Sequence, residues 1–196
     1  MNSTSRPDNH FSVSAMTMTA AITAIVCIVA PLALPIPVSP VPLSLGSFII
    51  MLAGCILGWK LGLVSCLLYL ALGILGLPVF SSYGSGLAKV AGPTGGYLLG
   101  YIPLVILTGL IFGKLHSRLL QGILIAAATV AVLYLPGTLW LAWQAHLTFS
   151  QALVMGVIPY IPGDIVKIML VVTVGSILRR RLASAGLLPT DTGLRG

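Results

Sequence analysis

The sequence predicts an all-α integral membrane protein in which about six transmembrane helices pack as one bundle. Of its 196 residues, 58% are hydrophobic and 7% are charged, whereas soluble domains carry about 25% charged residues. The mean hydropathy is +1.10, and the charged residues lie mainly at the ends of apolar runs. At about 20 residues per crossing, this length accommodates six spans with short connections.

Apolar runs of spanning length define six expected helices, which cover residues 14–34, 43–58, 60–76, 93–114, 119–142 and 160–181. The second and third runs are separated only by Gly58-Trp59-Lys60. Together they are too long for one crossing, so a tight turn is expected there. The membrane domain is then 14–181, flanked by tails at 1–13 and 182–196.

A cleaved signal peptide is the alternative for the N-terminus. Residues 1–13 hold only Arg6 as a clear positive charge, and the apolar stretch that follows runs long before Pro31. Both features disfavour cleavage.

Two connections between the expected helices are unusual. Residues 31–42 are rich in proline, which removes amide donors and blocks regular helix, so we expect a stiff, extended linker. Residues 76–96 are rich in Gly, Ser and Pro but retain Phe80, Tyr83 and Leu87. We expect this second loop to fold back onto apolar surface as a lid or pocket wall.

Positive charges near helix ends predict the orientation in the membrane. If the N-terminus is cytoplasmic, Lys89 is the one basic residue on the outer side, and the cytoplasmic side holds Arg6, Lys60, Lys114, Arg118, Arg179, Arg180, Arg181 and Arg195. This asymmetry requires an even number of spans, with both termini cytoplasmic. The two irregular loops and the start of the last helix then face outward.

Several classes of function are disfavoured. The basic residues mark helix ends and form no continuous stripe, so nucleic acid is not an expected partner. Cys27, Cys55 and Cys66 lie in apolar runs without metal-ligand spacing and are expected to pack as small hydrophobes. No Walker A, HExxH or GxSxG motif is present, so we predict neither an enzyme nor a cofactor. If ATP energises transport, another subunit must supply it.

The segment around Asp164 is the strongest candidate for a functional site. Asp164 and Lys167 stand three residues apart, on one face of a helix that begins with Pro162-Gly163. An ionisable group at membrane depth is costly and therefore indicates function. The structural alternative is an internal salt bridge at a helix start, where an acid complements the helix dipole. A broken helix with a charged pair is typical of transporters that bind polar substrates.

Small residues recur at four-residue spacing, which lets helices approach closely. In most cases we expect these small residues to pack within the bundle. The groups are Ala20 and Ala24; Gly54, Gly58 and Gly62; Gly92, Gly96 and Gly100; and Gly109 and Gly113.

Five segments resemble the BioY family, the biotin-binding S-components of energy-coupling factor (ECF) transporters. They are PVPLSLGSF (40–48), LAGCILGWKLG (52–62), GLPVF (76–80), GPTGGYLLGY (92–101) and PGDIVK (162–167). The resemblance implies a six-helix S-component of the bacterial inner membrane, with both termini cytoplasmic. It also implies biotin as substrate, with a transmembrane coupling (T) subunit and ATPase subunits as partners.

The resemblance places the substrate site in an outward pocket closed by the two irregular loops. The candidate substrate-binding residues are Asp164, Lys167, Tyr160, Lys89, Tyr83, Ser82 and Tyr97. Ala20 and Ala24 match the small residues of the first helix through which the family docks on its coupling subunit. Two departures affect single contacts: Gly46, where many relatives have Gln, and Ser81-Ser82-Tyr83. An S-component for another vitamin and a stand-alone proton-coupled carrier remain alternatives.

Overall fold

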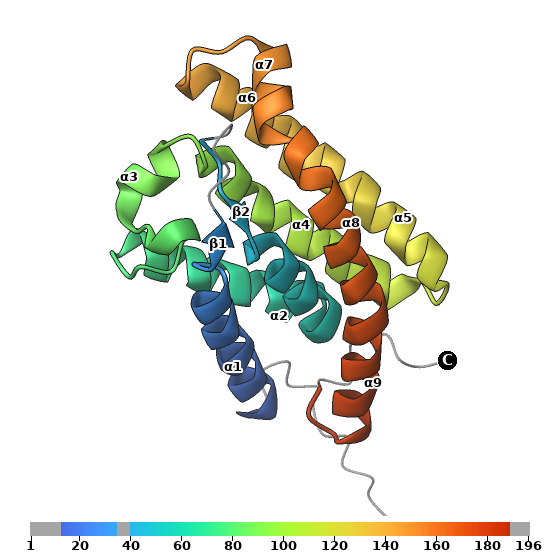
Figure 1. The fold of residues 1–196 in the computed structure, drawn as a ribbon. Coiled ribbons are helices and arrows are strands. Elements are labelled where there is room, and N and C mark those ends of the chain that lie inside the picture. Colours follow the sequence, from blue (N-terminus) through green and yellow to red (C-terminus); the bar gives the residue numbers. More distant parts are fainter. Residues whose placement is uncertain (1–12, 35–39, 189–196) are drawn as a thin grey trace, which may run out of the picture.

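The computed structural model describes residues 13–34 and 40–188, which are largely helical (Figure 1). In chain order the elements are α1 (Val13–Val29), β1 (Ala33–Leu34), β2 (Leu43–Ser44), α2 (Gly46–Ile74), the 3-10 turn η1 (Ser81–Tyr83), α3 (Gly86–Ala91), α4 (Gly95–Lys114), α5 (Arg118–Ala128), the π segment η2 (Thr129–Tyr134), α6 (Leu135–Gln144), α7 (Phe149–Gly156), the 3-10 turn η3 (Ile158–Tyr160), α8 (Ile161–Leu170), the π segment η4 (Val171–Gly175) and α9 (Ser176–Ser184).

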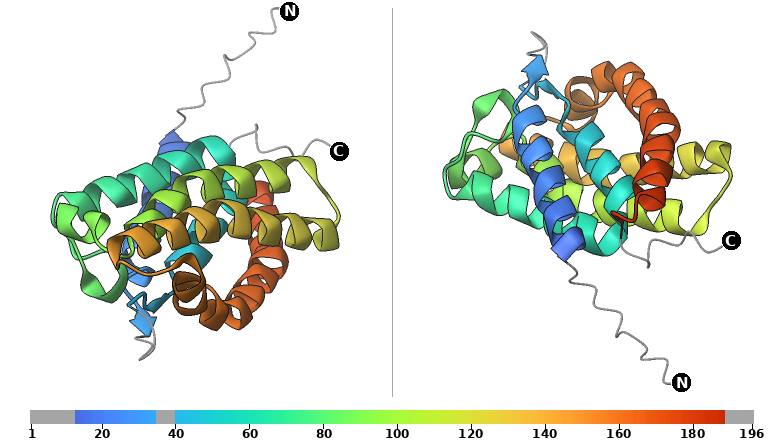
Figure 2. Two further views of the ribbon diagram at one scale, coloured as in Figure 1. Left: turned by 90° about the horizontal axis from the view of Figure 1, so that it is seen from above. Right: turned by 90° about the horizontal axis from the view of Figure 1, so that it is seen from below.

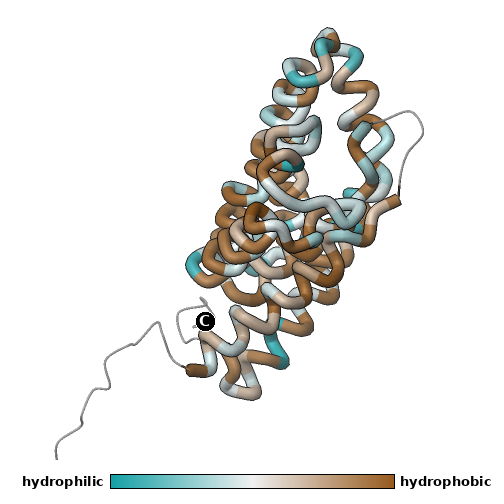
Figure 3. Tube along the Cα trace, turned by 90° about the vertical axis from the view of Figure 1, so that its left-hand side faces the viewer, coloured by the Kyte–Doolittle hydropathy of each residue, from teal (hydrophilic) through white to brown (hydrophobic). Residues whose placement is uncertain are grey.

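Within the described residues, four helical stretches are long and apolar enough to cross a membrane. They are Gly46–Ile74, Gly95–Lys114, Arg118–Gln144 and Phe149–Ser184, and α1 is a shorter apolar helix. Apolar positions predominate along the helices in Figure 3. The chain is therefore a multi-pass membrane protein, as the composition predicted.

The first of these stretches, α2, is broken at Gly58, where the backbone has φ 75° and ψ 179°. The left-handed φ at this position favours glycine. A Cβ at Gly62 would lie 3.2 Å from the Gly54 Cα, so the two parts of α2 fold back on each other. The tight turn expected at Gly58-Trp59-Lys60 is therefore present.

Glycines let α4 pack closely against its neighbours, as the four-residue spacing of small residues predicted. A Cβ at Gly109 would lie 2.4 Å from the Trp59 backbone nitrogen, and one at Gly100 would lie 2.7 Å from the Val132 carbonyl oxygen. No real Cβ tolerates such distances, so these positions require glycine for packing. Gly113 differs, because its Cβ position is open.

The long helix from Arg118 to Gln144 contains the π segment η2, which ends two residues before Pro136. Proline has no amide hydrogen and clashes with the carbonyl four residues earlier, and π bulges accommodate such irregularities, often at functional sites. Tyr134, at the end of η2, is thereby placed inside the bundle with 8% of its surface exposed.

Three of the expected helix boundaries need correction. The first helix ends at Val29, not at residue 34, because Pro31 follows and the chain then forms β1. The second expected helix begins at Gly46, not at residue 43, because Leu43 and Ser44 form β2, in which Ser44 lies opposite Ala33 of β1. The strand β1 agrees with the extended conformation expected for the proline-rich linker, whose residues 35–39 lie outside the described residues. The last helical stretch begins at Phe149, because Thr148 and Gln151 form a capping box that the sequence analysis missed.

The glycine-rich loop at 76–96 folds back only in part. Phe80 is fully buried and packs edge-on against Tyr69, with ring centroids 5.5 Å apart. Tyr83 and Leu87 are 64% and 68% exposed, contrary to the expectation that they pack against the bundle. The Ser82 amide donates to the Pro31 carbonyl at 3.0 Å, which ties this loop to the connection after α1.

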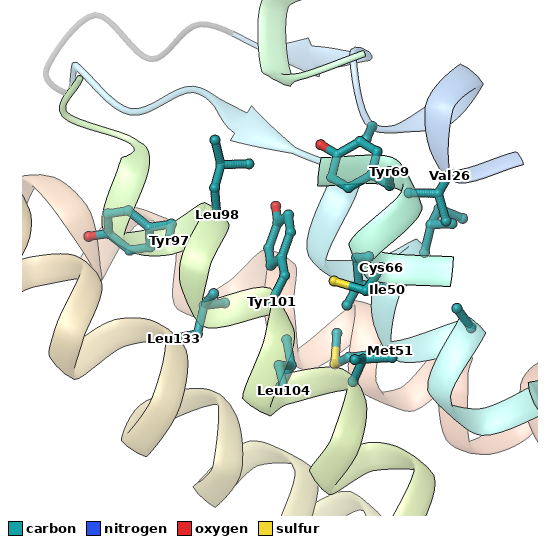
Figure 4. Close-up of a cluster of buried hydrophobic side chains, with 14 of the residues drawn as sticks. Val26, Ile50, Met51, Cys66, Tyr69, Tyr97, Leu98, Tyr101, Leu104 and Leu133 are labelled. Atoms are coloured by element: carbon teal, nitrogen blue, oxygen red, sulfur yellow. The ribbon is translucent and has the colours of Figure 1, made fainter. Parts of the chain in front are cut away.

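The bundle core lies between α2, α4 and the helices that flank them (Figure 4). Cys55 and Cys66 are fully buried there as free thiols, which confirms that they pack as small hydrophobes. The two described ends of the chain lie together, because the Ser14 hydroxyl donates to the Leu187 carbonyl at 3.2 Å. Figure 2 shows α1 and the α8–α9 stretch on either side of α2.

Candidate ligand-binding site

A cavity lies between β2, α2, α4, η2 and α8, where the last helical stretch restarts after Gly156. Its volume is about 60 Å³. Its lining combines aromatic rings, hydroxyls and one charged pair: Val41, Pro42, Ser44, Ser47, Tyr69, Ser81, Thr94, Tyr97, Leu98, Tyr101, Leu133, Tyr134, Gly156, Tyr160, Asp164 and Lys167. An apolar pocket with a few convergent polar groups is the usual form of a small-molecule site.

The charged pair is Asp164 and Lys167, which are 6% and 7% exposed. Lys167 Nζ lies 2.8 Å from Asp164 Oδ1, and the Tyr134 hydroxyl donates to Asp164 Oδ2 at 2.5 Å. Each carboxylate oxygen therefore has one charge-assisted or hydroxyl donor. An ionised carboxylate has about four lone-pair sites, so Asp164 can still accept hydrogen bonds from a ligand.

Lys167 also connects α8 to the opposite wall of the cavity. Its ammonium group donates to the Ser44 carbonyl at 2.8 Å and to the Ser47 hydroxyl at 3.1 Å. With Asp164, these acceptors use all three of its donor hydrogens. The lysine thus positions Asp164 and holds β2 and the start of α2 against α8.

Tyrosine hydroxyls close the same region from two sides. Tyr160 donates to the Val41 carbonyl, which holds the segment before β2 over η3. Tyr97 donates to the Gly156 carbonyl at 3.0 Å, a carbonyl at the end of α7 where regular helix stops. The tyrosines therefore satisfy backbone groups that the broken helix and the irregular segment leave without helical partners.

The remaining walls are aromatic and aliphatic. Figure 4 shows Tyr97 and Tyr101 projecting from α4, with Leu98 and Leu133 near them. The rings of Tyr69 and Tyr101 are 6.5 Å apart, so they form one continuous aromatic surface. Thr94 is 7% exposed, and among the described residues its hydroxyl has no hydrogen-bond partner. A buried hydroxyl on a cavity wall is available to a ligand.

Of the candidate residues predicted from sequence, Asp164, Lys167, Tyr160 and Tyr97 line this cavity together. Ser82 and Tyr83 lie beside it in η1 and are exposed, whereas their neighbour Ser81 lines it. Lys89 is half-buried on α3, outside the lining. Partial burial lowers the pKa of Lys89 below its ordinary value.

The sequence analysis did not select Ser44, Ser47 or Tyr134, although all three contact the charged pair. Ser44 and Ser47 belong to the segment PVPLSLGSF, whose polar residues next to a helix start were an available signal. Tyr134 had no such signal except Pro136 nearby. A Cβ at Gly46 would lie 2.6 Å from the Tyr101 hydroxyl, so glycine there is matched to this tyrosine.

The BioY family model matches residues 2–184. The chain belongs to the BioY family. This BioY chain is 42% identical over 133 residues to the probable biotin transporter BioY of Pyrococcus horikoshii, covering 67% of this chain and 76% of the relative. It is 34% identical over 179 residues to the biotin transporter BioY of Lactococcus lactis, covering 88% and 94%.

The fold of this BioY chain is also similar to a solved structure. The crystal structure of the S-component for biotin from an ECF-type ABC transporter has a TM-score of 0.81 and 31% identity, and covers 88% of this chain and 94% of that chain. Both the sequence family and the fold therefore agree with the resemblance found in the sequence.

Proposed function

We propose that this chain is the biotin-binding S-component of an importer, which captures biotin at the outer face and delivers it inward with an ATP-driven coupling module. The observation that carries the proposal is the buried carboxylate of Asp164 on the wall of a cavity lined by aromatic rings and hydroxyls. Membership of the BioY family and the similarity to a biotin S-component support it.

The cavity chemistry is complementary to biotin. The ureido ring has two N–H donors and one carbonyl acceptor, and the fused sulfur ring and valerate chain are mainly apolar. Asp164 has free lone pairs for the ureido N–H groups. The Thr94 hydroxyl can donate to a carbonyl, and the Tyr69 and Tyr101 rings can cover the apolar part.

We extend the proposed site to Ser82, Tyr83 and Lys89 as contacts that complete it when biotin enters. Ser82 and Tyr83 adjoin the lining residue Ser81. Lys89 provides a positive charge for the valerate carboxylate on the same side of the cavity as this turn, since its side chain packs beside Gly84.

Isothermal titration of the detergent-solubilised chain with biotin tests the proposal. We expect saturable binding of one biotin, and we expect Asp164→Asn to weaken it by more than about 1 kcal/mol through the loss of a ligand hydrogen bond. Competition with riboflavin and thiamine tests specificity. Absence of biotin binding by the intact, folded chain would refute the proposal.

We also propose six membrane crossings, formed by α1, the two parts of α2, α4, the α5–α6 stretch and the α8–α9 stretch. Proximity of Ser14 to Leu187 supports an even number of crossings, and the basic residues support cytoplasmic termini. Cysteine labelling tests this in a background without Cys27, Cys55 and Cys66. An impermeant thiol reagent should modify Lys89→Cys in intact cells and Lys60→Cys only after permeabilisation.

We propose that α1 docks on the transmembrane coupling subunit in the bacterial inner membrane, with ATPase subunits completing the importer. Ala20 and Ala24 are exposed on α1, while Thr19, Thr23 and Val26 face the bundle. A close approach needs such small residues. Ala24→Trp should abolish biotin uptake in cells and leave biotin binding by the purified chain unchanged. Uptake that persists in cells lacking all coupling subunits would favour a stand-alone carrier.

A further inference from the structure

An apolar groove runs along α5 and α8 on the side of the bundle away from α1. It consists of two adjoining cavities of about 360 and 380 Å³, which share Ala126, Ile165 and Ile168. The name α5–α8 groove is used below only for the cavity of about 380 Å³. Its lining residues are Arg118, Leu119, Gly122, Ile123, Ala126, Ile165, Ile168, Met169, Val172 and Thr173. Figure 1 shows the two helices side by side.

A cationic pocket adjoins one end of the α5–α8 groove, and Arg118 lines both. The other side chains of this pocket come from α4, α5, α9 and the turn between α4 and α5: Phe112, Leu115, His116, Gln121, Ser176, Arg179 and Arg180. Arg118 and Arg180 are exposed. The one carboxylate of residues 13–34 and 40–188 is Asp164, and Lys167 neutralises it inside the bundle. The field at this pocket is therefore positive.

The start of α5 adds to that field. Ser117 makes no side-chain cap on α5, so the first-turn amide hydrogens are not satisfied by a cap. These amides carry the positive end of the helix dipole and favour a nearby anion. The cationic side chains and the helix end thus act on the same position, at the mouth of an apolar groove.

We propose that the α5–α8 groove and the cationic pocket form one binding site for an anionic phospholipid. An acyl chain lies in the groove, and the phosphate is held between Arg118 and Arg180. Guanidinium groups bind phosphate oxygens in a bidentate manner, and basic residues at the membrane surface are at the depth of lipid headgroups.

The dimensions agree with one leaflet of a bilayer. From Arg118 to Ala126 the helix rises about 12 Å, at 1.5 Å per residue, while half of the hydrocarbon core is about 15 Å thick. A headgroup at Arg118 therefore places most of its acyl chain along the groove. The flanking side chains Leu119 and Ile123 are 76% and 55% exposed, as expected for residues that face lipid.

Native mass spectrometry of the full chain tests the proposal. The chain is first reconstituted in nanodiscs of equal parts phosphatidylglycerol and phosphatidylcholine and is then released into a mild detergent. We expect one retained phosphatidylglycerol per chain in excess over phosphatidylcholine. Arg118→Gln with Arg180→Gln should lower its retention at least tenfold, because both charge-assisted contacts to the phosphate are lost. Lys114 is a basic residue that lines neither the α5–α8 groove nor the cationic pocket. Lys114→Gln is therefore the matched control and should retain the lipid.

A second variant separates the acyl chain from the headgroup. Gly122→Leu fills the α5–α8 groove, because a Cβ there meets only the Val172 side chain at 4.0 Å, and should also release the lipid. Equal retention of both lipids, or unchanged retention in the arginine variant, would overturn the proposal. A site for the soluble anion would be shown by two results together: free phosphate or glycerol phosphate at millimolar concentration displaces the lipid, and Gly122→Leu has no effect. These results would also overturn the proposal.

Discussion

Replacement of Lys167 by methionine tests whether the charged pair is held together as the structure indicates. The substitution keeps an unbranched side chain of similar shape but removes an ammonium group with three acceptors, the Asp164 carboxylate, the Ser44 carbonyl and the Ser47 hydroxyl. Asp164, which is 6% exposed, would keep only the Tyr134 hydroxyl. A buried charge that loses its partner costs about 3–5 kcal/mol.

The reciprocal and double variants determine the cause. Asp164→Asn alone should cost less, because Lys167 keeps two acceptors and the Asn side chain can still accept from Tyr134. Asp164→Asn with Lys167→Met removes both charges and should recover most of the lost stability, since replacing a whole buried ion pair is often neutral. Biotin binding should not recover, because the carboxylate acceptor is absent.

Thermal unfolding of the detergent-solubilised chain without ligand measures the effect. At about 2–4 °C per kcal/mol for a chain of this size, Lys167→Met should lower the Tm by about 6–20 °C. Lys114→Met, at an exposed lysine, is the control and should change little. If Lys167→Met unfolds within about 2 °C of the unsubstituted chain, or if the double variant is no more stable than Lys167→Met, the reasoning is refuted.

Three further substitutions test the packing and the polar network. Gly109→Ala should destabilise the chain by about 1–3 kcal/mol through overpacking against the Trp59 backbone; Gly113→Ala, in open space on the same helix, should be neutral or stabilising by up to about 1 kcal/mol. Equal Tm values for the two would contradict this packing. Tyr134→Phe removes the 2.5 Å donor to Asp164 and should weaken biotin binding about tenfold or more by titration; unchanged affinity would exclude a role in positioning the carboxylate.

The membrane class and the charged pair were predictable from the sequence because both depend on local information. A mean hydropathy of +1.10 excludes a soluble globular protein. The separation of three residues places Asp164 and Lys167 on one face of a helix. The turn at Gly58 followed from the length of a bilayer crossing. The family was also recognisable, because its motifs are short contiguous segments.

Other features depended on contacts between distant parts of the chain. Tyr134 reaches Asp164, and Lys167 reaches Ser44 across 123 residues, so no local pattern identifies these partners. Whether a loop residue is buried likewise depends on what packs over it, which is why Phe80 is covered and Tyr83 is exposed.

By itself the sequence determined that the chain crosses a membrane, where its helices lie approximately and that Asp164 and Lys167 share a face. The hydropathy of the apolar runs and the helical periodicity are properties of the local sequence, so their interpretation required no tertiary structure. The structure alone decided which hydroxyls surround the carboxylate and how the last helical stretch is broken. These features depend on how separate helices pack, and the glycines at helix contacts determine how closely the helices approach one another.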